Sequence, residues 1–257
     1  MNPLIEEIAK TSIQLMLQEP FYGHFFSSIL KDVSDKTDSV TLSLSGKHMI
    51  KLLVNENYWN TELKTDNEDR TKNLRYGAIK HQILHIVFKH MMRMNEFGDK
   101  QLFNIAADIT TNQYINSDQL TYDSVRFEDF PDFNLTRGQS LDYYYKKLKE
   151  QLDGINASKG GQSDTEDDEN DDLNESQQKL LDLMNNKDHK QLNQHKFWEE
   201  IQKMSSTEQK ILESALNESI LQSVVRMKER RIGNLPAGLQ LYLDLLCLLY
   251  TSPSPRD

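Results

Sequence analysis

Apolar and polar residues in the first quarter of the chain follow two different periods, which predict two kinds of element. Residues Asn2–Ile29 read as helical, with an interruption at Glu19-Pro20. Apolar and polar residues then alternate over Ser39–Leu44, and Met49–Val54 can return after a turn at residues 45–47. This alternation predicts a β-hairpin behind an N-terminal helical segment.

Helical patterns return in the second half of the chain. A closing helix is expected over 140–152, and three more over 175–184, 196–203 and 205–230. Ser205 is followed three residues later by Glu208, which is a capping box and predicts the start of the last helix. These three later helices offer packing positions and no cluster of catalytic residue types.

Two apolar helices in the middle of the chain carry its most informative polar residues. The run Tyr76–Met94 contains no Pro and is apolar through most of its turns, as in a buried helix. The helix predicted over Gln101–Ile115 is also apolar, but Asn104, Asp108 and Asn112 fall at i, i+4 and i+8 on one stripe. Buried polar groups need partners, so this pair of helices is the candidate site.

His81 and His85 stand four residues apart, so both imidazoles can point at one metal ion from the same helix face. Zinc peptidases use this spacing with a Glu after the first His, which takes a proton from the water that zinc activates. Here the residue is Gln82, whose amide can hydrogen-bond water but cannot accept a proton. The motif predicts zinc binding with impaired hydrolysis. The alternative is a pair of core histidines without a metal.

Asp108 is the predicted third ligand, because a buried carboxylate needs a cation or a metal. Ala106 and Ala107 are small enough to let its helix approach the first one closely. Two imidazoles and one carboxylate make a three-ligand set of the catalytic type. An ion pair between Asp108 and Arg93 is the alternative.

His90 lies nine residues after His81, which is the opposite face of a continuous helix. It could turn back only if the helix stopped first, usually at a Gly, and the sequence has no Gly between His85 and His90. We therefore place His90 behind Asp108, as a supporting or packing residue or an alternative ligand. Asn104 and Asn112 are candidates for the same supporting role.

These motifs together resemble a metallopeptidase domain that precedes a von Willebrand factor A-like domain in bacterial proteins. The matching residues are His81, His85 and His90, then the N-x-A-x-D-like stretch 104–108 with Asn112, and later 233–239. The resemblance spans roughly residues 1–246 and implies a zincin-like fold, a Zn²⁺ cofactor and a peptide or protein substrate. Gln82 in place of Glu, and Lys89 where a Gly is common, depart from the family pattern. Proteins of this kind often accompany ATPases of the AAA class.

Residues 247–257 look like a translated transposase sequencing adapter, and such tails are left out of fold reasoning. The natural reading frame is then expected to break off near Leu246. The one cysteine, Cys247, falls in this tail, so the rest of the chain has no thiol for a disulfide. Glu and Gln codons differ by one base, so resequencing the codon for residue 82 would also test whether Gln82 is natural.

Charge and hydropathy narrow the classes of function. The formal net charge is −10, and nine acidic residues against one Lys between Asp153 and Gln178 account for most of it. This Gly-, Ser-, Asn- and Asp-rich stretch predicts a disordered acidic linker. The rest of the chain has no basic stripe for nucleic acid, no membrane span and no signal-peptide pattern at its start. These features favour the reducing cytoplasm. His189 and His195 lie in polar surroundings, and we expect both at the surface.

The sequence therefore predicts a mostly helical α+β protein. The expected parts are a zincin-like metallopeptidase domain over 1–152, the acidic linker over 153–178 and a helical segment over 179–238. After these parts we expect the start of a von Willebrand A-like region over 239–246 and the artefactual tail over 247–257. Two functions remain open: an impaired zinc-dependent metallopeptidase, or a non-catalytic interaction module that works with a partner ATPase and whose histidines are structural only.

Overall fold

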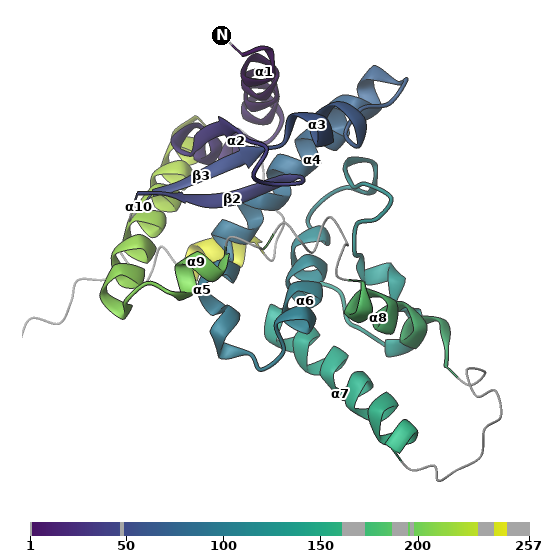
Figure 1. Ribbon diagram of the computed structural model, residues 1–257. Coiled ribbons are helices and arrows are strands. Elements are labelled where there is room, and N and C mark those ends of the chain that lie inside the picture. The colour runs from purple at the N-terminus through teal and green to yellow at the C-terminus, as the bar shows by residue number, and fades with distance from the viewer. Residues whose placement is uncertain are drawn as a thin grey trace, which may run out of the picture.

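A computed structural model describes residues 2–46, 49–160, 173–186, 195, 198–230 and 239–245 of the chain. It is mostly helical with one small sheet, which confirms the predicted α+β class (Figure 1). The sheet, the N-terminal helices and the last long helix form one group, and α6, α7 and α8 form another. The long helix α4 contacts both. The two helices expected to hold the site thus lie where these groups meet.

The sheet contains the predicted hairpin and one strand that was not predicted. Strands β2 (Val40–Ser45) and β3 (Met49–Val54) pair antiparallel, with Val40 opposite Val54. Strand β1 (Leu30–Val33) pairs parallel to β3, so the order is β1-β3-β2. The sequence of β1 is short and half polar, and only its pairing with a strand twenty residues later makes it a strand.

The N-terminal helical segment is two helices, α1 (Pro3–Gln18) and α2 (Pro20–Ser28), divided at Glu19 as expected. Each begins with a Pro in its first turn, where the missing N–H costs nothing. Helix α3 (Glu56–Thr61) follows the hairpin. Helix α10 (Ser206–Arg230) packs on α2, and Ser205 and Glu208 form the predicted capping box, with Ser205 Oγ 2.8 Å from Glu208 Oε2.

The buried helix predicted over 76–94 is interrupted. Helix α4 (Glu68–Val87) begins at the N-cap Asn67, whose side chain accepts from the Arg70 N–H, and it ends before Lys89. Lys89 takes a left-handed conformation with φ 56°, which is uncommon for a residue with a side chain. Its ammonium lies 2.7 Å from Glu213 Oε1 of α10. The short helix α5 (His90–Arg93) then continues in a new direction.

Helix α6 (Lys100–Asn112) begins at Asp99, whose carboxylate caps the Leu102 N–H, and it packs on α7 (Leu141–Gly160). Helix α7 runs eight residues beyond the predicted end at 152, into the segment expected as linker. Helix α8 (Glu175–Asn185) begins as predicted. Residues 161–172, the most acidic part of that segment, lie outside the described residues, so the disorder of the linker stays a prediction.

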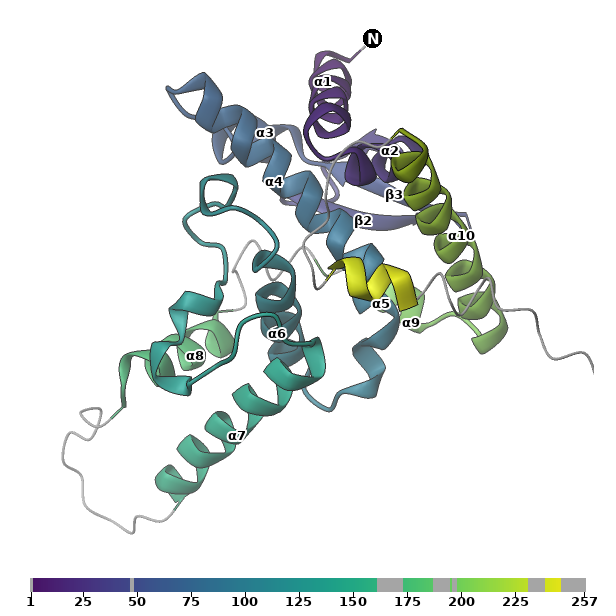
Figure 2. The same cartoon turned by 180° about the vertical axis from the view of Figure 1, so that it is seen from behind.

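The remaining elements are short. Helix α9 (Trp198–Gln202) lies within the predicted range 196–203 and packs against α5 and β2. Single 3₁₀ turns are formed by Met94–Glu96, Ser117–Gln119, Phe127–Asp129 and Pro131–Phe133. The helical segment 239–245 lies beside the end of α4, where the rings of Tyr242 and Phe88 are 5.6 Å apart (Figure 2). Residues 231–238 and 246–257, which include the tail predicted over 247–257, lie outside the described residues.

A buried charge network fixes α4 against the hinge between α1 and α2. Lys80 is 2 % exposed, and its ammonium donates to Glu19 Oε1 at 2.8 Å. The Tyr76 hydroxyl donates to the other carboxylate oxygen at 2.8 Å. Burial lowers the pKa of Lys80, and the nearby Glu19 carboxylate opposes that shift. Because Lys80 directly precedes His81, this network fixes α4 next to the candidate site.

Replacing Glu19 with Ala should lower the free energy of unfolding by about 2–4 kcal/mol, because it leaves a buried ammonium and hydroxyl without their acceptor. Urea denaturation followed by circular dichroism measures the change. The double variant Glu19→Ala/Lys80→Met is the control, and it should regain part of the loss because the uncompensated charge is gone. A single variant as stable as the natural protein would contradict this account.

Candidate metal centre

Helix α4 presents two histidines from one face, as their spacing predicts. His81 and His85 are both buried, and their Nε2 atoms lie 2.8 Å apart. The ring centroids are 4.4 Å apart and the rings are nearly perpendicular, at 76°. Both imidazoles therefore direct one nitrogen at the same point between α4 and α6.

Helix α6 brings Asp108 to that point. Its side chain is fully buried, and Oδ1 lies 3.5 Å from Nε2 of His81 and 3.2 Å from Nε2 of His85. The alternative ion pair with Arg93 is wrong, because that guanidinium pairs with Asp142 at 2.7 Å and with Glu96 at 2.8 Å. The structure thus brings together the three residues predicted as ligands.

His195 also enters the cluster, and the expectation that it lies at the surface is wrong. It is 2 % exposed, and its Nε2 lies 3.2 Å from Asp108 Oδ1 and 3.3 Å from His85 Nε2. The Trp198 ring packs over the imidazole, with centroids 3.9 Å apart. This neighbouring Trp was the available sequence signal, since a large aromatic residue indicates burial. His189 lies outside the described residues.

His90 approaches the cluster from behind His85, because the chain turns at Lys89. Its Nδ1 lies 2.9 Å from Nδ1 of His85, and it is fully buried. The inference that His90 faces away was wrong, because the helix stops at Lys89, although a helix usually stops at a Gly. The residue still contacts the outer nitrogen of a predicted ligand, which is the geometry of a supporting residue.

Asn112 supports His81 in the same way and fixes which nitrogen carries the proton. Its Nδ2 donates to the Val125 carbonyl oxygen at 2.7 Å, which leaves Oδ1 as the acceptor 2.8 Å from His81 Nδ1. His81 must therefore donate from Nδ1, and a neutral ring then presents a lone pair on Nε2 toward the cluster. Asn104, one turn before Asp108 on α6, is only half buried and has no hydrogen bond to the cluster among the described residues.

The electrostatics of the site favour a bound cation. Burial lowers the pKa of His81, lowers that of His85 further and lowers that of His90 to about 3. Burial alone would raise the pKa of Asp108, but the surrounding imidazoles, His195 foremost, bring it below its ordinary value. The carboxylate of Asp108 is thus ionised, and it lies among imidazoles away from the solvent-exposed surface. A buried charge of this kind needs a cation.

The donor atoms have the spacing of a tetrahedral metal site. Bonds of 2.0–2.1 Å to a tetrahedral zinc place neighbouring ligand atoms about 3.3 Å apart. Five of the six separations within the group His81, His85, Asp108 and His195 are 2.8, 3.2, 3.2, 3.3 and 3.5 Å. All four side chains are buried, and their ligand atoms lie within 4.8 Å of one another. The residues present fit a metal ion.

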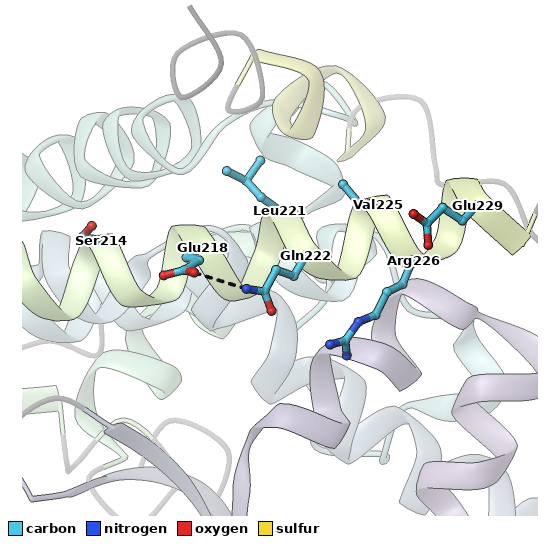
Figure 3. A pocket seen from close by; sticks show the side chains of 7 residues that line it. All are labelled: Ser214, Glu218, Leu221, Gln222, Val225, Arg226 and Glu229. Carbon is cyan, nitrogen blue, oxygen red and sulfur yellow. Dashed lines mark hydrogen bonds between the residues drawn. The ribbon is translucent and has the colours of Figure 1, made fainter.

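The cluster is closed to solvent. A cavity of about 20 Å³ borders His81 between α4 and the turn at Gln119. Gly77 allows this close approach, because a Cβ there would lie 1.9 Å from the Gln119 carbonyl oxygen. A wider groove of about 640 Å³ runs along α10 beside Glu218 and Arg226, and none of the four cluster residues lines it (Figure 3). Gln82 is fully buried beside His81 on α4.

Comparison with known proteins gives one match. No curated protein and no solved structure matches the chain. Among the described helices, none is long and apolar enough to cross a membrane. A family model described as "Putative metallopeptidase domain" matches residues 69–241, a range that runs from α4 to the helical segment 239–245 and contains all four cluster residues. The match covers well over half of the chain, which therefore belongs to this metallopeptidase-domain family.

Proposed function

We propose that this chain is a zinc-binding, metallopeptidase-like protein whose hydrolysis is impaired because Gln82 stands at the position of the general base. The observation that carries the proposal is the convergence of His81, His85 and Asp108 at a buried point with tetrahedral spacing. Imidazole nitrogens with one carboxylate oxygen are a ligand set that zinc favours. We therefore infer from the types of ligand atom that the bound ion is zinc.

A zincin-like arrangement accounts for the placement of the sheet. Strand β2 is an edge strand of the sheet and packs on α4, the helix that carries His81 and His85. Peptides can pair with an exposed strand edge by adding a strand of their own. We therefore propose that the substrate or partner is an extended segment of a peptide or protein, bound along β2.

The chemistry of the site depends on a proton acceptor as well as a metal. Zinc supplies a Lewis acid that polarises a carbonyl and acidifies water. In H-E-x-x-H sites the Glu accepts the proton, and general-base assistance of this kind contributes roughly 10²–10⁴-fold in rate. Gln82 cannot accept a proton. Glu96 is no substitute in this structure, because its carboxylate pairs with Arg93.

An interaction module is the second candidate, and the enclosed cluster favours it. A metal site whose four candidate ligands are all buried resembles structural zinc sites, which hold a fold together. On this reading the chain recruits protein partners, and an ATPase of the AAA class and a following von Willebrand A-like domain are proposals from resemblance alone. We also propose the cytoplasm as its compartment, since Cys247 is the sole cysteine.

The first test is metal content. The purified full chain should contain about one zinc, measured by inductively coupled plasma mass spectrometry after growth in zinc-replete medium. His81→Ala and His85→Ala should abolish binding, and Asp108→Ala should weaken it. His24→Gln, a change of a buried histidine of α2 outside the cluster, should leave the zinc in place. A metal-free natural protein would refute the proposal.

The second test concerns the residues that orient the ligands. Asn112→Ala should lower zinc affinity by roughly 10–100-fold, because His81 loses the acceptor that directs its Nε2 lone pair inward. Competition with a chelator measures the affinity. Asn104→Ala is the matched control on the same helix and should leave the affinity unchanged. Equal effects of the two variants would contradict the assigned role of Asn112.

The third test restores the proton acceptor. The natural protein should hydrolyse an unfolded protein substrate feebly, and Gln82→Glu should raise the zinc-dependent rate by at least about tenfold. The comparison uses equal zinc occupancy in both proteins. A natural protein that already cleaves the substrate in a zinc-dependent way, with no gain from Gln82→Glu, would show that Gln82 is not the limiting residue.

A further inference from the structure

Four donor atoms surround the point where the metal-dependent chemistry would occur, although a catalytic zinc needs only three protein ligands and an open position. His81, His85 and Asp108 come from α4 and α6, which pack together in the core. His195 comes from a part of the chain 110 residues beyond His85. A local movement of the chain around His195 could therefore withdraw this one ligand, while α4 and α6 keep the other three in place.

His195 is held in place by the cluster and by Trp198. Its ring packs on Trp198, at the start of α9, and Trp198 also lies edge-on to the His85 ring, with centroids 5.0 Å apart. Helix α9 is anchored by the buried Ile201 and by Gln202, whose amide donates to the Met91 carbonyl of α5. Every described contact that places His195 thus comes from the cluster itself or from α9.

Helix α9 also packs against β2, the edge strand proposed to receive an extended peptide (Figure 1). The same short helix therefore contacts this strand and packs on the imidazole at the fourth ligand position. A ligand supplied from the chain itself, together with a helix over the substrate strand, is the arrangement expected of an internal inhibitory segment.

We propose that His195 and α9 form an internal cap, in which His195 fills the fourth coordination position and α9 covers part of the β2 edge. The proposal rests on the proposed zinc site. In this resting state four protein atoms would hold the metal, and release of His195 would open one position for a ligand from solution. Release breaks one metal–nitrogen contact and the packing of His195 on Trp198, and it leaves three ligands to retain the ion.

The test uses the full chain with Co²⁺ in place of zinc, and acetohydroxamic acid as the probe of an open position. His195→Ala should retain about one metal per chain, and the probe should shift its cobalt absorption bands. The natural protein should bind the probe at least about tenfold more weakly, because only the uncapped fraction of molecules is competent. Added imidazole should compete with the probe in His195→Ala, since it can refill the vacated position.

Trp198→Phe is the second variant, which keeps the four donors and loosens the support of His195. It should bind acetohydroxamic acid more tightly than the natural protein and less tightly than His195→Ala. Equal probe affinity in all three proteins would overturn the cap. Complete loss of metal from a folded His195→Ala would also overturn it, because His195 would then be needed to hold the ion. Absence of metal from the natural protein would instead refute the zinc site itself.

Discussion

The structure depends on one buried carboxylate. Asp108 has no exposure to solvent, and three imidazoles, two from α4 and that of His195, lie within 3.5 Å of its Oδ1. An ionised group in that position is costly unless a cation or several donors offset it. The need for such a partner explains why α4, α6 and His195 converge there. A dication among these donors offsets the charge of Asp108 and the repulsion between facing nitrogen lone pairs at once.

Residues behind the candidate ligands orient the imidazoles toward Asp108. Asn112 holds the proton of His81 on the outer nitrogen, and His90 occupies the outer side of His85. His90 can do so only because the backbone turns at Lys89, where φ is 56°. A left-handed residue other than Gly, Asn or Asp is strained. The ion pair of Lys89 with Glu213 and the burial of Met91 and His90 hold the chain in that turn.

The sequence was sufficient wherever local periodicity and chemistry agree. Helical spacing placed His81 and His85 on one face, and the polar stripe on an apolar helix identified Asp108 and Asn112. It failed where tertiary contacts decide. Nothing local marks Lys89 as a helix end, so His90 was assigned to the wrong face. His195 lies 110 residues after His85 and has no fixed spacing to the motif, and its burial follows from packing against Trp198 of α9. Strand β1 likewise exists only through its pairing with β3.

Gln82 and His195 would limit hydrolysis in different ways, and their effects should be separable. Gln82 affects the chemical step, because it removes the proton acceptor, whereas His195 affects the fraction of molecules with an open position on the metal. The rate is the product of these two quantities, so Gln82→Glu and His195→Ala should act multiplicatively. In a structural zinc site, His195 and the Gln82 amide would contribute to stability alone. Neither Gln82→Glu nor His195→Ala would then raise a rate of hydrolysis. Multiplicative gains in rate would therefore mark this centre as a restrained metallopeptidase site, and their absence would mark it as a structural zinc site.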